Sequence, residues 1–162
     1  MGDRLIKIAV YIIVFLVVAL VLFYLGSFTY LSLDSKRSRG STLKEGRLGP
    51  CPGTPNCVLS EEKDKPSYIE PFPITGNAAE QWAKMKGSVI DIGGKIEADT
   101  GTYLWATFRT RFWRFVDDLE LRLDEKNGVI HVRSASRVGK GDMGMNRKRV
   151  EELRKIFNSK SI

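Results

Sequence analysis

Hydrophobic residues fill the first part of the chain and alternate with polar residues in the second. Residues 8–33 carry no charged side chain and consist mostly of Ile, Val, Leu, Phe and Tyr. This run exceeds the ~20 residues that a helix needs to cross the hydrocarbon core of a membrane. It also exceeds the apolar run of roughly 7–15 residues in a cleaved signal peptide. The pattern therefore predicts an uncleaved, single-span transmembrane anchor over residues 1–33.

The clearest strand pattern lies in residues 115–137, where two alternating runs flank a turn. The dipeptide Asn127-Gly128 predicts a tight hairpin turn, in which both residues supply the positive φ that such a turn requires. Pairing Asp124 with Val129 directs one set of side chains to a single, largely apolar face: Leu119, Leu121, Leu123, Ile130, Val132 and Ser134. We expect the opposite face to be solvated and to carry cross-strand ion pairs.

Further periodicities place this hairpin in a larger sheet with two helices. One helical stripe follows Asn77, which can cap it, and another runs through residues 146–157. Strands are expected at residues 95–99, 103–110, 115–124 and 129–137. The sequence thus predicts an α+β fold, in which two helices cover one face of an antiparallel sheet of about four strands.

Composition divides the chain into three parts. The anchor at residues 1–33 is followed by residues 34–46, which are rich in Ser, Gly, Lys and Arg and suit a basic, flexible tether. The remaining residues, 47–162, are enough for one hydrophobic core but not for two. We therefore expect a single α+β domain behind the tether.

Two cysteines lie in a loop at the start of this domain. Cys51 and Cys57 flank a segment rich in Pro and Gly, which can bring their Cα atoms within the ~4.4–6.8 Å that a disulfide requires. A redox-active pair usually has two intervening residues at a helix N-terminus, and a zinc site needs more ligands than His131 alone can add. A structural disulfide is the favoured interpretation, and neither metal nor cofactor is expected.

Flanking charges and cysteines disagree about the side of the membrane on which the domain lies. More cations follow the apolar run, in residues 36–44, than the two that precede it, Arg4 and Lys7. This count favours the cytoplasm. A disulfide, and a short basic head before a long apolar run, are typical of exported proteins. We expect the domain on the periplasmic side of the inner (plasma) membrane.

Polar and charged side chains should gather where the hairpin meets the last helix. Asp117 faces Ser136 at the edge of the core, and three consecutive cations, residues 147–149, oppose the dipole of that helix. Nearby carboxylates could compensate these cations in an internal ion-pair network, or the cluster could bind a small anion. Its candidate members are Asp117, Asp118, Ser134, Ser136, Arg137, Asn146, Arg147 and Arg149.

A second candidate surface lies between the second and third strands. Arg109, Arg111 and Trp113 interleave with other aromatic and basic residues at a turn, where they could stack on a ligand or enter a membrane interface. Cation–π or edge packing of the tryptophan is the competing interpretation. The net charge of +7 is scattered, and no nucleic-acid-binding motif is present, so nucleic acid is not an expected partner.

No motif defines a catalytic site. Residues 139–144 fit the spacing G-x-G-x-x-G, but a dinucleotide site also needs a second parallel strand and an acidic residue ~20 positions later. His131 is expected on the solvated face, without a nucleophile beside it. An enzymatic activity is therefore less favoured than a binding or structural role.

Several motifs resemble one protein family. They are the cysteine loop with its following valine (residues 49–58), Phe-Val-Asp-Asp at 115–118, the strand at 129–137 and Asn-Arg-Lys-Arg-Val-Glu at 146–151. The chain is similar over residues 43–157 to a family known as domain of unknown function number 1499. This resemblance implies bacterial and plastid-type proteins that are often exported or membrane-anchored, with no established activity.

These observations favour a non-enzymatic accessory or assembly subunit of a membrane protein complex. The alternative is a receptor for a small anion or an anionic lipid headgroup at Arg137, Arg147 and Arg149. A hydrolase or redox enzyme is the third and least favoured interpretation.

Overall fold

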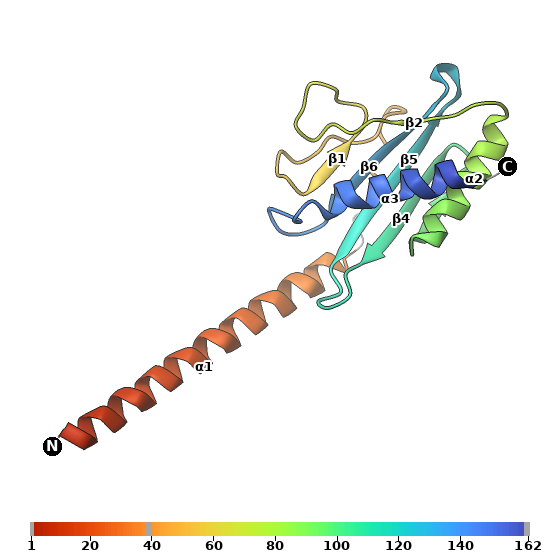
Figure 1. Ribbon diagram of the computed structural model, residues 1–162. Helices are drawn as coiled ribbons and strands as arrows, with labels where there is room; N and C mark the ends of the chain where they lie inside the picture. The colour runs from red at the N-terminus through yellow and green to blue at the C-terminus, as the bar shows by residue number, and fades with distance from the viewer. Residues whose placement is uncertain (1, 38–39, 161–162) are drawn as a thin grey trace.

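A long N-terminal helix leads into a sheet with two further helices (Figure 1) in this computed structural model, which describes residues 2–37 and 40–160. Residues 38–39, which belong to the expected tether and include one of its cations, lie outside the described residues. The described elements are α1 (Gly2–Ser35), β1 (Cys57–Leu59), β2 (Phe72–Pro73), α2 (Ala78–Asp91), β3 (Lys95–Asp99), β4 (Tyr103–Arg109), β5 (Val116–Asp124), the 3-10 helix η1 (Glu125–Asn127), β6 (Val129–Ser136) and α3 (Met145–Ser159).

The helix α1 is apolar along most of its length and projects away from the sheet (Figure 1). Its most apolar 18-residue window has a mean hydropathy of 3.1, and none of that window is buried. At about 1.5 Å per residue, a helix of this length extends about 50 Å, whereas a hydrocarbon core is about 30 Å thick. The helix is therefore long and apolar enough to cross a membrane.

The predicted hairpin register is confirmed, but its turn differs from the expectation. Asp124 pairs with Val129 and Asp117 with Ser136. The turn is a short 3-10 helix, in which the Asp124 side chain accepts a hydrogen bond from the Asn127 backbone N–H. Only Gly128 has a positive φ among these turn residues, at 62°. The prediction of a positive φ at Asn127 was wrong, because the 3-10 turn leaves the left-handed conformation to the glycine alone.

The sheet has six strands across the described residues, not about four, in the order β1-β6-β5-β4-β3 with β2 also on β6. The four expected strands correspond to β3, β4, β5 and β6. The two that were missed have only three and two residues, too few to show alternation. Both pair with the otherwise open edge of β6, which imposes their extended conformation.

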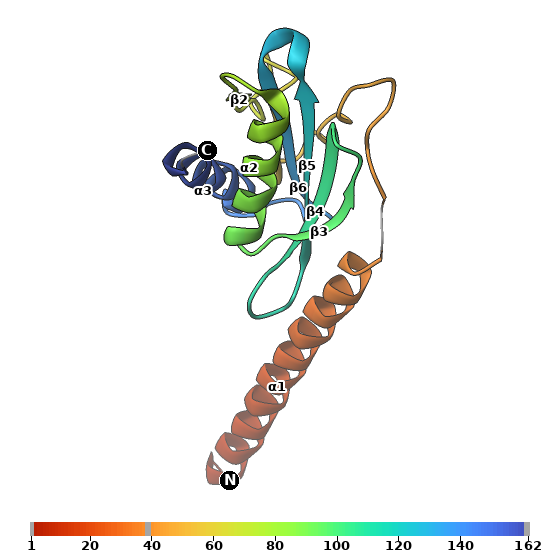
Figure 2. The ribbon, with the colours of Figure 1, turned by 90° about the vertical axis from the view of Figure 1, so that its right-hand side faces the viewer.

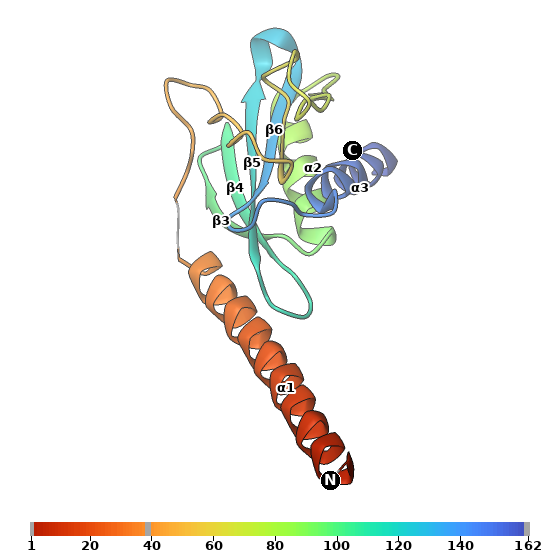
Figure 3. The ribbon, with the colours of Figure 1, turned by 90° about the vertical axis from the view of Figure 1, so that its left-hand side faces the viewer.

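Helices α2 and α3 cover one face of the sheet (Figures 2 and 3). The Asn77 side chain caps α2, as expected, by accepting hydrogen bonds from the backbone N–H groups of Ala79 and Glu80. Between the helices and the sheet lies the main core, which includes Met85, Val89, Leu104, Leu119, Leu121, Val132, Val150 and Leu153. This arrangement confirms the α+β class and the face on which the helices pack.

The opposite face was expected to be solvated, and that expectation was wrong near the middle of the sheet. Glu120 is 0% exposed there. Its carboxylate accepts hydrogen bonds from the Thr42 N–H and hydroxyl, both at 2.7 Å, from Tyr103 at 2.6 Å and from Arg133 at 3.1 Å. Leu48 and Leu59 pack beside Tyr103 in a second apolar cluster. The segment that precedes the cysteine loop therefore covers this face.

Replacing Glu120 by alanine should destabilise the protein strongly. The substitution leaves the Arg133 guanidinium buried without its carboxylate, and breaking a buried ion pair in this way costs about 3–5 kcal/mol. It also releases Thr42, so residues 40–48 should become sensitive to protease. Chemical denaturation and limited proteolysis measure the two effects. Glu125→Ala in the exposed turn is the control, and an equal loss of stability in both variants would contradict the assignment.

Candidate functional site

The C-terminal end of α1 is joined to the sheet through Arg137. This arginine makes two hydrogen bonds to the Asp118 carboxylate, Nη2 to Oδ1 at 2.7 Å and Nε to Oδ2 at 2.8 Å. Its Nη1 donates to the carbonyl oxygens of Ser35 and Arg37, at 3.1 and 3.0 Å. The Ser35 carbonyl belongs to the last residue of α1, and Arg37 follows two residues later. Backbone acceptors at a helix C-terminus lack intrahelical partners and carry partial negative charge. Arg137 therefore links the helix terminus to β5.

Serines on α1 add backbone contacts to this junction. The Ser32 hydroxyl donates to the Trp113 carbonyl, and the Ser35 hydroxyl accepts from the Val116 N–H at 3.2 Å. The two serines lie three positions apart and therefore on the same face of the helix. Both are buried, unlike most of α1. Sequence analysis missed them, although a pair of hydroxyls at this spacing near the end of an apolar helix is a detectable signal.

Aromatic stacking completes the contact between α1 and the sheet. The rings of Phe28 and Trp113 are stacked with centroids 5.0 Å apart, and Phe115 lies 6.3 Å from Phe28. Trp113 belongs to the loop between β4 and β5, residues 110–115, which lies beside the end of α1 in Figures 1–3. Of the candidate surface expected here, Trp113 packs on α1, whereas Arg109 and Arg111 are exposed. Trp113 is half-buried by this packing, so the competing interpretation of a packed tryptophan holds for the face of its ring that lies against Phe28.

Most residues of the predicted polar cluster form an internal network between β5, β6 and α3. Arg149 donates to Asp117 at 2.6 Å and to Ser134 at 3.0 Å. Asn146 accepts from Ser134 at 2.7 Å, and its amide donates to Ser136 at 3.0 Å. The Arg149 cation thus has a carboxylate partner, and its guanidinium also lies over the Phe108 ring at 4.6 Å.

Asp118 lies on the other face of the sheet from Asp117, as the strand alternation predicts. It is nevertheless buried, because α1 and Arg137 approach that face. The predicted cluster is therefore divided between two layers. Asp117 holds α3 on one side, and Asp118 holds α1 on the other.

Arg147 differs from the other two candidate arginines. Within residues 2–37 and 40–160 it donates to backbone carbonyls alone, those of Tyr68 at 2.9 Å and Pro66 at 3.4 Å, and it is exposed. At the start of the same helix, Asp142 accepts from the N–H groups of Gly144 and Asn146 at 2.9 and 2.7 Å. Asp142 thus supplies the negative charge that this cationic helix start requires.

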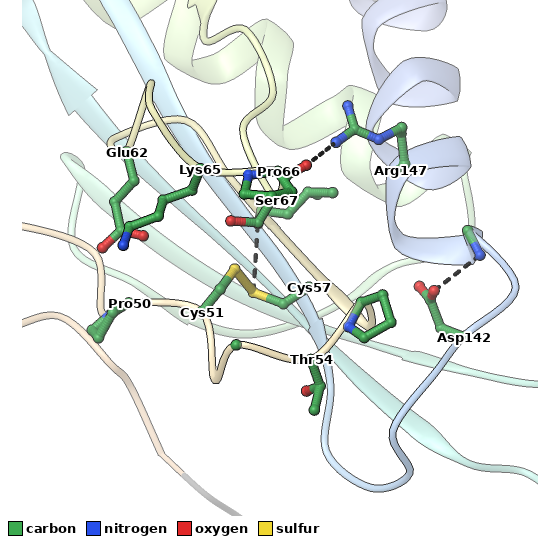
Figure 4. Close-up of a pocket in the computed structure, with 14 residues that line it drawn as sticks. Pro50, Cys51, Thr54, Cys57, Glu62, Lys65, Pro66, Ser67, Asp142 and Arg147 are labelled. Atoms are coloured by element: carbon green, nitrogen blue, oxygen red, sulfur yellow. Dashed lines mark hydrogen bonds between the residues drawn. A yellow bond between two sulfur atoms is a disulfide. The ribbon is translucent and has the colours of Figure 1, made fainter.

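Arg147 also lines a cavity of about 470 Å³ beside the disulfide (Figure 4). Cys51 and Cys57 are bonded, with their Cα atoms 5.7 Å apart, as predicted. The wall opposite the cysteine loop carries Glu62 and Lys65, so the lining contains both signs of charge. The cavity lies between the cysteine loop, residues 62–67 and the start of α3.

His131 occupies a half-buried position on the outer face of the sheet. Its Nδ1 is 3.1 Å from the Ser60 hydroxyl, and its Nε2 is 3.6 Å from Asp124. Burial, with the positive charge of Arg122 next in size, lowers the pKa of His131 below its usual value, although the nearby Glu61 carboxylate opposes the shift. The expectation that no nucleophile lies beside His131 was wrong in this respect, because the buried Ser60 hydroxyl lies within hydrogen-bond distance of the imidazole. The same hydroxyl accepts a hydrogen bond from the Val132 N–H.

No set of three or more His, Cys, Asp or Glu side chains within residues 2–37 and 40–160 is arranged to hold a metal ion. The fold and site therefore define a disulfide-bridged α+β domain with a candidate membrane helix fastened to it. Residues 47–157 match a protein family described as a protein of unknown function, DUF1499. The match covers more than half of the chain, which belongs to this family. No curated protein matches the chain.

The unusual pKa of His131 predicts how stability depends on pH. Because the pKa of the folded state lies below that of the unfolded state, near 6.5, the unfolded chain takes up a proton first as the pH falls. The free energy of unfolding should therefore decrease below about pH 6.5 and level off below the folded pKa. His131→Gln should flatten this dependence between pH 7.5 and 5.5.

Urea unfolding midpoints across this pH range measure the effect. His131 is the single histidine of the chain, and the lowered pKa of Asp124 acts in a separate, more acidic range. A variant that retains the full pH dependence would show that another group is responsible.

Proposed function

We propose that the chain is a single-span membrane protein whose domain lies on the periplasmic side of the inner membrane. In this proposal it is a non-enzymatic accessory or assembly subunit of a membrane protein complex. The single observation that carries the proposal is the junction between α1 and the sheet, where Arg137 and Trp113 contact the end of the helix. A domain fastened in this way has a defined orientation to the membrane, which suits a subunit that positions its partners.

The disulfide supports the periplasmic side. Disulfides persist in oxidising compartments such as the periplasm and are rare in the cytosol. The competing argument from flanking cations is weakened by the structure around Arg37. The Arg37 guanidinium is 3.7 Å from the Asp34 carboxylate. Arg37 also follows the last turn of α1, and the helix dipole stabilises a cation near this end. This cation therefore has a local structural reason to be present.

Native mass spectrometry of the full chain, gently extracted from its own membrane, tests the proposal. We expect a stoichiometric protein partner and a chain mass lower by two hydrogens, as the disulfide requires. Tyr30→Ala should weaken retention of the partner, because Tyr30 is exposed on α1 close to the domain. Tyr11→Ala, the same substitution at the far end of α1, is the matched control. A bare chain would contradict the subunit role, and free thiols would contradict the proposed compartment.

The cavity beside the disulfide supports a second candidate function, the binding of a small anion. Arg147 and Lys65 line it, whereas the cations of Arg137 and Arg149 are engaged by aspartates. If an anion binds, Arg147 is therefore the arginine that can reach it.

Phosphate should then raise the thermal unfolding midpoint of the parent protein but not that of Arg147→Gln. Arg154→Gln is the matched control, since Arg154 also extends from α3 to backbone carbonyls, those of Glu70 and Pro71. Arg154 is not part of the cavity lining. Equal phosphate effects in both variants and the parent would exclude this site.

A further inference from the structure

The loop between β4 and β5 presents an aromatic and basic tip next to α1. Phe112 is 90% exposed, and Arg111 and Arg114 on either side of the Phe-Trp pair are exposed as well. A single exposed phenylalanine is unremarkable on a protein surface. The position of this one is informative, because the loop extends beyond the sheet along the apolar helix (Figures 2 and 3).

Hydrogen bonds within the loop hold its tip in a defined shape. The Thr110 N–H donates to the Phe115 carbonyl at 2.9 Å, and the Phe115 N–H donates to the Thr110 hydroxyl at 2.9 Å. Arg114 adopts a positive φ of 55°, which is uncommon for a residue with a large side chain. The stacking of Trp113 on Phe28 fixes the loop to α1. The exposed side chains are thus presented by an ordered turn.

The length of the charge-free run in α1 indicates how deep in the membrane this loop would lie. The charge-free run, residues 8–33, extends about 39 Å as a helix, close to the roughly 40–45 Å of a bilayer with its headgroups. Phe28 lies five positions before the end of this run, or about 8 Å along the axis. If α1 spans the membrane, Phe28 and the stacked Trp113 lie in the interfacial layer. Tryptophan is enriched in that layer because its ring has an apolar body and a polar N–H.

Charge at the tip suits the same layer. No ion pair among residues 2–37 and 40–160 involves Arg111 or Arg114. A cation near an anionic membrane surface is attracted by about 1 kcal/mol, and a guanidinium matches the geometry of a phosphate. The exposed Phe112 ring and the two neighbouring arginines therefore combine an apolar group and cationic groups, as interfacial membrane segments do.

We propose that residues 111–114 form a second membrane contact, with Phe112 at the boundary between headgroups and acyl chains and Arg111 and Arg114 on the phosphates of anionic lipids. This inference rests on the proposed function, in which α1 crosses the membrane. The loop and the helix would together hold the domain at two points. The domain then cannot rotate freely about the helix axis, and the cavity beside the disulfide keeps a fixed direction relative to the membrane plane.

Depth-dependent fluorescence quenching of the full chain in lipid nanodiscs tests this contact. Both native cysteines are bonded to each other, so Phe112→Cys supplies the only free thiol for an environment-sensitive dye. The nanodiscs contain phosphatidylcholine, with or without phosphatidylglycerol, and lipids that carry a quencher near the headgroup or deep in the acyl chain. Lys126→Cys, in the exposed turn at the other end of β5, is the aqueous control. Leu16→Cys, in the middle of α1, reports whether the helix spans.

We expect the dye at position 112 to be quenched several-fold more by the shallow quencher than by the deep one, and more strongly when phosphatidylglycerol is present. Arg111→Gln with Arg114→Gln in the same labelled chain should remove the phosphatidylglycerol effect. Quenching at position 16 with none at position 112 would overturn this inference and leave the membrane anchor intact. Absence of quenching at position 16 would overturn the proposed function itself. Protection at position 112 by a bound protein, without quenching by lipid, would assign the loop to a protein interface and overturn the lipid contact.

Discussion

The bidentate ion pair between Arg137 and Asp118 is the interaction on which the position of α1 depends. The guanidinium faces a carboxylate on one side and the carbonyls of Ser35 and Arg37 on the other. Both charges are buried, and a buried charge requires a partner with good hydrogen-bond geometry. Without Arg137, the carbonyls of Ser35 and Arg37 would face the buried Asp118 carboxylate with no cation between them, although the Trp105 indole N–H would still donate to Asp118. The loop beside α1 is held by further contacts, the stacking of Trp113 on Phe28 and the hydrogen bond from the Ser32 hydroxyl to the Trp113 carbonyl.

The same logic repeats along β5, in which three buried acidic residues each pair with an arginine from outside the strand. Asp117 pairs with Arg149 of α3, Asp118 with Arg137 and Glu120 with Arg133. Adjacent residues of a strand point to opposite faces, so the first pair fastens a core helix and the second fastens α1. Glu120 in turn receives Thr42 from the segment before the cysteine loop.

Buried ion pairs of this kind contribute little net stability compared with apolar packing. Their geometric demands can specify which segments meet. In this protein, one central strand is the common attachment for three other segments, and each attachment uses a different carboxylate. We therefore interpret the acidic residues of β5 as positioning groups rather than as a reactive site.

Much of the fold could be predicted because its long elements show clear periodicity. Alternation over β5 and β6 determined the register, and the stripes of α2 and α3 showed which face they cover. The short strands could not be predicted, since Cys57–Leu59 and Phe72–Pro73 become strands only by pairing with β6. The outer face was predicted to be wet because the segment that covers it has no apolar pattern and uses the polar Thr42 instead.

The candidate site was predictable by residue type but not by pairing. Sequence placed Asp117 and Asp118 on opposite faces and drew attention to the arginines. The partner of each arginine depends on how α1 and α3 approach the sheet, which no local pattern reports. The aromatic contact of Phe28 was missed, because one phenylalanine in an apolar helix does not differ from its neighbours.

The pairing of β1 with β6 has a consequence for the order of folding. Cys57 pairs with Ala135. The strand β1 therefore cannot pair until nearly the whole domain, including β6, has been synthesised. The disulfide closes over only a few residues and can form earlier. An exported chain would thus pass through a stage in which its helix is inserted and its cysteine loop is closed, while the sheet is still incomplete. Contacts of such long sequence separation favour slow folding, and an unpaired β6 edge is exposed to other chains during this interval.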